Sequence, residues 1–292
     1  MSLAPLYAKA AAGTVGPRAS TLPDTVLRRT VDVDRAHLAG YARVCGFRLT
    51  DTLPPTYPHV LAFALQVELM AGRSFPLPLP GLVHVANAIT VHRRIDAGER
   101  LELAVHAERF TGHPKGAQVD LVAAMDVGGE RVWDGRSTYL ARGARAPGEG
   151  PARPAPPEIG DGPASALWRV EGDTGRRYAA VSGDVNPIHL YPLTAKAFGF
   201  PRAIAHGMWT AARALAALQG RLPDALTYDV AFARPLLLPS TVELRTRAVV
   251  GGWGLDVRSG KGPHLTAVVR PTDPATVRPD GSEGTGAGPR TA

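Results

Sequence analysis

The sequence predicts an α+β fold built from two similar halves, each of which wraps antiparallel strands around one buried helix. Three observations support this prediction. A stretch rich in Pro, Gly and Ala over residues 142–164 interrupts the chain of 292 residues. Short motifs recur in the same order on both sides of that stretch. In each half, a strongly apolar helical segment precedes several runs with alternating, β-type patterning.

The recurring motifs indicate that the two halves are degenerate copies of one unit. The segment YARVCG at residues 41–46 matches YAAVSG at residues 178–183. The other matches are short, and it is their common order that favours a repeat. They pair His59 with His206, Leu79-Pro80 with Leu222-Pro223, residues 91–95 with 232–236, and residues 101–103 with 242–244.

The composition along the chain predicts its division into parts. The first half covers residues 1–145, of which residues 1–25 look like a loosely structured lead-in. Residues 146–164 contain too few apolar residues to fold alone, which is typical of a linker. The second half covers residues 165–272, and we expect residues 273–292 to form a disordered tail.

Each half contains one helix that is apolar nearly all round, and such a helix is buried on most faces. The pattern places these helices at about residues 58–70 and 206–218. Alternating runs follow each helix, with short Gly-containing breaks that fit hairpin turns. In the first half these strands are predicted at residues 83–95, 100–110, 117–127 and 131–140, and in the second at 226–236, 241–250, 254–258 and 264–270.

Composition excludes several classes of protein. The formal charge is +7, but the Arg residues are scattered and we find no nucleic-acid-binding motif, so we expect no nucleic-acid partner. No apolar run reaches membrane-spanning length, and no secretory signal is evident, so we expect a cytoplasmic protein with no membrane contact. The single cysteine, Cys45, excludes an internal disulfide and a multi-cysteine metal site. The Arg-rich composition also suits a phosphate-bearing ligand such as coenzyme A.

The segment Tyr178–Ala195, YAAVSGDVNPIHLYPLTA, carries the chemistry of the chain. It places an acid, Asp184, close to an imidazole, His189, and is followed by AHGMW at residues 205–209. An acid and a base held together can share the handling of one water molecule, which adding water to a double bond requires. Without further context, an Asp-x-Asn-Pro segment is more often a helix-capping turn beside a surface histidine.

This segment resembles the hydratase motif of the MaoC-like dehydratases, the (R)-specific enoyl-CoA hydratases. The motif's aromatic residue, small residue, Gly-Asp-x-Asn-Pro core, aliphatic residue, His and final small residue are all present, at Tyr178, Ser182, residues 183–187, Ile188, His189 and Ala195. The resemblance implies a hot-dog fold and, with two degenerate halves, a double hot-dog: two antiparallel sheets, each wrapped on a central helix and joined into one. The first half has Phe47 where the second has Asp184, so we expect one active site.

The resemblance implies that Asp184 and His189 are catalytic, and that Gly207 gives its backbone N–H to the thioester oxygen. An imidazole titrates near neutrality, which favours His189 as the base, but the sequence leaves open which of the two is the base and which the acid. We expect Asn186, Ser182, His206 and Met208 at the substrate site, although the residue types favour a turn or core role for Asn186 and Ser182, and a structural role suits His206 at least as well as a chemical one. We expect no metal site.

The predicted function is a hydro-lyase that interconverts trans-2-enoyl and (R)-3-hydroxyacyl thioesters in fatty acid metabolism. No cofactor is expected beyond the coenzyme A or the phosphopantetheine arm of an acyl carrier protein that the substrate itself carries. The sequence leaves the oligomeric state open between a homodimer and a monomer, because a double hot-dog can mimic within one chain the dimer that single hot-dogs form. The alternatives are a hot-dog acyl thioesterase and a non-catalytic acyl-binding subunit.

Overall fold

The computed structural model describes Tyr7, residues 18–150, Ile159 and residues 162–272. Most of the predicted lead-in, most of the linker and the predicted tail at residues 273–292 lie outside these described residues. None of the described helices combines the length and apolar character needed to cross a bilayer.

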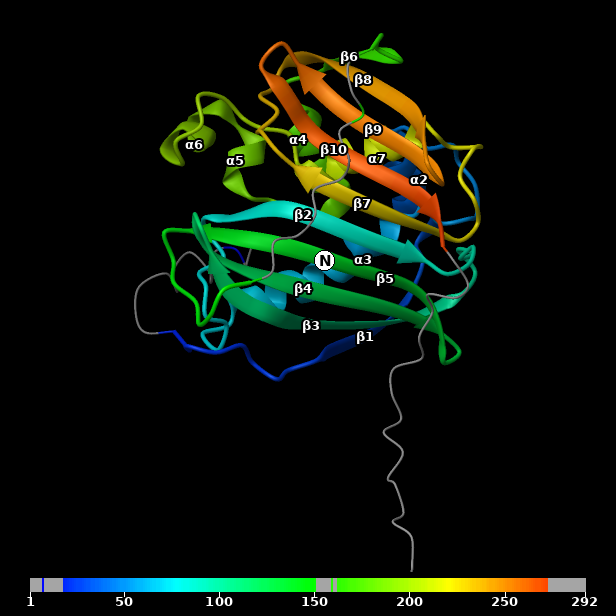
Figure 1. Cartoon of the computed structure of the whole chain (residues 1–292). Coiled ribbons are helices and arrows are strands. Elements are labelled where there is room, and N and C mark those ends of the chain that lie inside the picture. The colour runs from blue at the N-terminus through cyan, green and yellow to red at the C-terminus, as the bar shows by residue number, and fades with distance from the viewer. Residues whose placement is uncertain (1–6, 8–17, 151–158, 160–161, 273–292) are drawn as a thin grey trace, which may run out of the picture.

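The first half consists of an edge strand, two helices and four longer strands (Figure 1). Helix α2 begins after Asp34, whose carboxylate accepts hydrogen bonds from two backbone N–H groups, and ends at Gly46, which adopts a left-handed φ of 81°. The elements are β1 (Leu27–Asp32), α2 (Arg35–Cys45), α3 (Tyr57–Ala71), β2 (Leu82–Val91), β3 (Arg100–His113), β4 (Gly116–Val127) and β5 (Glu130–Arg142).

The second half repeats this order and inserts two short helices. Helix α4 corresponds to α2 and also ends at a left-handed glycine, Gly183, with φ 74°. The elements are β6 (Ala166–Val170), α4 (Thr174–Ser182), α5 (Pro187–Leu190), α6 (Pro192–Ala197), α7 (Gly207–Ala216), β7 (Leu226–Phe232), β8 (Ser240–Val249), β9 (Gly252–Ser259) and β10 (Gly262–Pro271).

All strands join in one antiparallel ten-stranded sheet of order β1-β3-β4-β5-β2-β7-β10-β9-β8-β6. The order within each half, read from its outer edge inwards, is the same, which confirms that the halves are structural copies. They meet where β2 pairs with β7, from Ala86 opposite Ala231 to Val91 opposite Leu226. The prediction of a sheet wrapped on central helices is therefore confirmed, with the two half-sheets fused into one.

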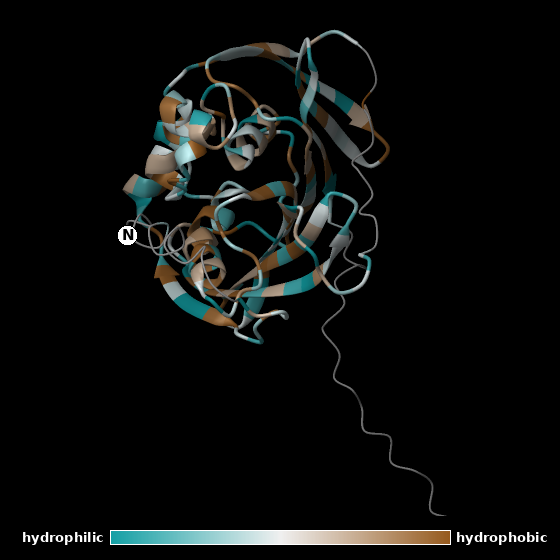
Figure 2. Ribbon diagram, turned by 90° about the vertical axis from the view of Figure 1, so that its left-hand side faces the viewer, coloured by the Kyte–Doolittle hydropathy of each residue, from teal (hydrophilic) through white to brown (hydrophobic). Residues whose placement is uncertain are grey.

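The sheet curves around the helices and encloses the core (Figure 2). Helix α3 is buried on almost every face, as its lack of a polar stripe predicts. The halves share one hydrophobic cluster, and a hydrogen bond of 3.1 Å from the indole Nε1 of Trp209 on α7 to the carbonyl oxygen of Val44 on α2 links them. This common core holds the two halves in a fixed relation, and the candidate site lies where they meet.

The principal helix and strand boundaries agree with the predicted ones to within a few residues, whereas the edge strands β1 and β6 and the helices α2, α4, α5 and α6 had no predicted counterpart. β1 and β6 contain only six and five residues. Segments of that length show too few alternations for a period of two to stand out.

Candidate active site

Asp184 takes its position from the end of α4. The left-handed Gly183 turns the chain away from the helix axis, and Asp184 is the next residue. The hydroxyl of Ser182 accepts a hydrogen bond of 3.2 Å from the Asp184 backbone N–H. Ser182 thus fixes the turn, which is one of the two roles that its sequence context left open.

Asn186 and Pro187 place His189 on the short helix α5. The Asn186 side chain caps the helix by accepting from the N–H of Ile188 at 3.4 Å, and Pro187 occupies the first helical position, where its missing donor costs nothing. The Asn186 N–H donates to Oδ1 of Asp184 at 3.2 Å, so the same turn orients the carboxylate. Helix α4 approaches closely at Gly175, where a Cβ atom would lie 2.0 Å from the His189 carbonyl oxygen.

His189 is held in the tautomer that a base requires. Its Nδ1 lies 2.8 Å from the carbonyl oxygen of Ile204, and because a carbonyl oxygen only accepts, Nδ1 carries the proton. Nε2 of the neutral ring is therefore unprotonated. Burial lowers the pKa of His189 below its usual value, and the nearby carboxylate of Asp184 offsets only part of this effect. The imidazole is consequently neutral at neutral pH.

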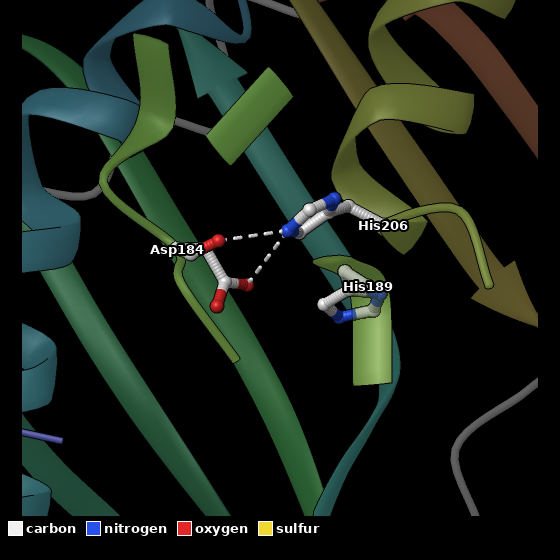
Figure 3. Close-up of side chains that lie close together, drawn as sticks. All are labelled: Asp184, His189 and His206. Atoms are coloured by element: carbon white, nitrogen blue, oxygen red, sulfur yellow. Dashed lines mark hydrogen bonds and ion pairs between the residues drawn. The ribbon is translucent and has the colours of Figure 1, made fainter. Parts of the chain in front are cut away.

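His206 joins the pair from the residue that precedes α7 (Figure 3). Its ring stacks on that of His189 with centroids 3.7 Å apart. Its Nε2 donates to the backbone oxygen of Asp184 at 3.0 Å and lies 3.7 Å from Oδ2 of the same residue. Burial, together with the neighbouring His189, lowers the pKa of His206 to about 3. His206 therefore acts as a neutral donor that ties α7 to the Asp184 turn.

Asp184 is ionised although its carboxylate is largely shielded from solvent. Burial alone would raise its pKa, but His206, His189, the Tyr7 hydroxyl and the Asn186 N–H together lower that pKa below its usual value. Both histidines are neutral near pH 7, so their charge contributes only in acid. At neutral pH the hydrogen-bond donors Tyr7 and Asn186 stabilise the carboxylate.

Gly207 begins α7, so its N–H is one of those that find no partner within the helix. A Cβ atom at this position would lie 3.0 Å from the Phe232 ring, which leaves no room for a side chain without movement of that ring. Met208, the next residue, is buried in the core. The structure thus brings Asp184, His189, His206 and the start of α7 together, whereas Ser182 and Asn186 form the turn.

The first half supplies a wall of the site that the sequence did not indicate. Tyr139 on β5 stacks on His84 of β2 at 4.7 Å, and His84 contacts Phe232 at 5.0 Å between centroids. Burial and the charge of Asp184 both raise the pKa of Tyr139. Tyr7, from the predicted lead-in, also reaches the site and donates to Oδ1 of Asp184 at 2.7 Å. No motif surrounds either tyrosine, so no sequence signal could have found them.

In the first half, the positions that match Asp184 and Ser182 are occupied by side chains that pack in the core. Phe47 follows the left-handed Gly46 as Asp184 follows Gly183. Phe47 is buried and stacks on Tyr41 with centroids 6.3 Å apart. Cys45, which aligns with Ser182, is fully buried, and burial raises its pKa to about 12. This half therefore presents no carboxylate at the matching turn.

Within the described ranges, Asp184, His189 and His206 form the one group of three potential metal ligands, with donor atoms all within 4.8 Å of one another. Nδ1 of His189 and Nε2 of His206 are already engaged by backbone carbonyl groups. The arrangement equally suits a water molecule placed between an acid and a base. That no metal takes part stays a prediction.

The fold and the site define a double hot-dog protein with one acid–base pair. Residues 157–263 match the family described as MaoC-like domain. A relative from Mycobacterium tuberculosis, 3-hydroxyacyl-thioester dehydratase X, is 42% identical over 271 residues, which cover 91% of this chain and 96% of that protein. The chain therefore belongs to the MaoC-like dehydratase family, as its motif indicated.

Solved structures agree with this membership. The crystal structure of HtdX of Mycobacterium tuberculosis superposes with a TM-score of 0.75 at 40% identity, over 85% of this chain and 100% of that chain. A MaoC-like dehydratase from Phytophthora capsici shares the fold, with a TM-score of 0.69 at 20% identity, over 88% of this chain and 98% of that chain. The predicted hot-dog architecture is thus confirmed.

Proposed function

We propose that the protein is a hydro-lyase that interconverts trans-2-enoyl and (R)-3-hydroxyacyl thioesters. One observation carries the proposal: an ionised carboxylate, Asp184, and the unprotonated Nε2-bearing ring of His189 share a single site beside the N-terminus of α7. The name of the 42% identical relative, a 3-hydroxyacyl-thioester dehydratase, supports the same reaction class.

The proposed hydration begins with one water molecule between the two side chains. Oδ2 of Asp184 accepts a hydrogen bond from this water, and Nε2 of His189 takes its other proton as the oxygen bonds to C3 of the substrate. The electron pair of the double bond moves toward C2 and the thioester carbonyl. The acid–base pair then returns the proton to C2, so that H and OH of one water are added. Dehydration follows the same steps in reverse.

Gly207 would stabilise the enolate that forms between these two proton transfers. A backbone N–H at a helix N-terminus is a fixed donor, and the helix dipole favours negative charge there. Asn186 and Ser182 would keep the acid–base turn in place, while His206 and Met208 would border the thioester. In this proposal the first-half residues His84 and Tyr139 close the opposite side of the site.

The carrier is proposed to be coenzyme A or the phosphopantetheine arm of an acyl carrier protein. The chemistry calls for no further cofactor, since one water and two titratable side chains balance every atom of the reaction. A cytoplasmic location, a homodimer and the absence of nucleic-acid or membrane partners remain expectations from the sequence.

The test is an assay that separates hydration from thioester hydrolysis. The full chain would be incubated with crotonyl-CoA and with longer trans-2-enoyl-CoA substrates, while enoyl absorbance and free thiol are followed together. Loss of enoyl absorbance without thiol release, and an (R)-3-hydroxyacyl product on chiral analysis, support the proposal. Thiol release with unchanged enoyl absorbance would instead identify a thioesterase. The absence of both changes would favour a non-catalytic acyl-binding subunit.

A further inference from the structure

Tyr7 contacts the candidate catalytic acid from a distant part of the chain. Its hydroxyl lies 2.7 Å from Oδ1 of Asp184, although 177 residues separate the two in sequence. The Tyr7 side chain is half-buried and packs against the hydrophobic core shared by both halves. A phenol donor to a carboxylate is a charge-assisted hydrogen bond, about twice as strong as a neutral one.

The surroundings of Asp184 make this donor important. Besides Tyr7, the titratable groups around Asp184 are His59 on α3, Tyr178 on α4, His189 on α5, Tyr139 on β5 and His206, which precedes α7. Burial lowers the pKa of His59 to about 4, as it lowers those of His189 and His206, and burial raises the pKa of Tyr178 and Tyr139. Each of these groups is therefore uncharged near pH 7. The carboxylate then relies on hydrogen-bond donors for its stabilisation.

The two carboxylate oxygens have different neighbours. Oδ1 accepts from the Tyr7 hydroxyl and from the Asn186 N–H. Oδ2 lies 3.7 Å from Nε2 of His206, on the side of the two stacked histidines (Figure 3). With Oδ1 engaged by two donors, the carboxylate cannot rotate freely, and Oδ2 is the oxygen presented to a water beside His189.

We propose that Tyr7 is a positioning residue of the active site, which fixes the Asp184 carboxylate through Oδ1 and leaves Oδ2 for the reacting water. This inference rests on the proposed hydratase function and adds to it a residue from outside the hydratase motif. A rival role for the same contact is self-inhibition, in which the phenol oxygen occupies the place of the water and must leave before substrate binds. The two roles predict opposite effects of removing the hydroxyl.

The test compares Tyr7→Phe with wild type and with Tyr57→Phe. The control loses a buried tyrosine hydroxyl whose 2.8 Å partner is Nδ1 of His37, away from Asp184. For Tyr7→Phe we expect kcat for crotonyl-CoA hydration to fall roughly tenfold or more, as for loss of a hydrogen bond to a charged group. KM should stay within about threefold, and kcat should lie below that of wild type across the whole pH range. Tyr57→Phe should keep the wild-type profile.

A second measurement does not depend on activity. The Asp184 carboxyl carbon would be titrated by NMR in wild type and in Tyr7→Phe, and its pKa should be higher in the variant because the donor is gone. An unchanged pKa, a kcat profile that superposes on wild type, or a faster Tyr7→Phe enzyme would each overturn the inference, the last in favour of self-inhibition. If wild type itself fails to hydrate enoyl thioesters, the proposed function fails, while the titration still decides whether Tyr7 holds Asp184.

Discussion

The imidazole rings of His189 and His206 stack with centroids 3.7 Å apart and planes inclined by 27°. Two imidazoles at this distance repel each other strongly when both are charged, and burial further disfavours their charged forms. The ring of His189 therefore helps to keep His206 neutral. The stack also joins the start of α7 to α5, which brings the candidate oxyanion donor and the candidate base into one site.

The acid limb of the pH–rate profile should lie below pH 6.5. His189 has a pKa lowered by burial and Asp184 has a pKa lowered by its partners, so both are unprotonated at neutral pH. Activity should hold as the pH falls from 7 and decline only when His189 gains a proton. A profile of kcat for crotonyl-CoA hydration measures this, and an acid limb centred at or above the ordinary histidine pKa of about 6.5 would contradict it.

Gly175→Ala should displace the base without touching the substrate. The new Cβ would lie 2.0 Å from the carbonyl oxygen of His189, so α4 and α5 must separate. We expect kcat to fall by about one order of magnitude or more, as misplacement of a catalytic group by a fraction of an ångström does. Gly260→Ala is the matched control, because a Cβ there meets nothing within 4 Å. Equal activity of the two variants would show that α5 tolerates the shift.

Gly207 offers a test of the oxyanion donor through a pair of substitutions. Gly207→Ala keeps the N–H and brings a Cβ to 3.0 Å from the Phe232 ring, whereas Gly207→Pro also removes the donor at a first helical position where proline is tolerated. Loss of such a donor costs about 10²–10³ in kcat. Gly207→Pro should therefore be slower than Gly207→Ala by that factor when both are folded by circular dichroism. Similar rates in the two variants would exclude the Gly207 N–H as the oxyanion donor.

Phe47→Ala should weaken the fold and spare the chemistry. Phe47 is buried and stacks on Tyr41 at the first-half position that matches Asp184. Truncation of a buried Phe costs about 3–5 kcal/mol of unfolding free energy, which thermal denaturation would register as a lower Tm. Below that Tm, kcat should equal that of wild type. A stable variant that loses hydration selectively would show that the first half takes part in catalysis.

The helices and strands whose apolar residues form a clear pattern along the sequence were predictable. Helix α3 is apolar on almost every face, and its burial follows directly from that composition. The repeated YAxVxG segment marked equivalent points of the two halves, and the structure shows that it forms the ends of α2 and α4, each closed by a left-handed glycine, although the sequence did not predict these helices. The short edge strands carry too few residues for alternation to be recognised.

Sequence predicted the site where the chain is locally continuous and, through the family resemblance, at His206 and Gly207 before and at the start of α7. Asp184, Asn186 and His189 lie within one turn-and-helix segment, so their spacing fixes their proximity. Tyr7 and Tyr139 reach Asp184 through tertiary packing across both halves, and neither has neighbours in sequence that mark it. The hydrogen bond of His206 to the Asp184 backbone is likewise a consequence of how α7 packs.

The most direct test of the central claim is the hydration rate of Asp184→Asn and of His189→Ala with crotonyl-CoA. Both variants should retain the wild-type circular dichroism spectrum and lose kcat by about 10²–10⁴, because each removes one member of the acid–base pair. Near-normal hydration by either folded variant would contradict the assignment of Asp184 and His189 as the residues that handle the water.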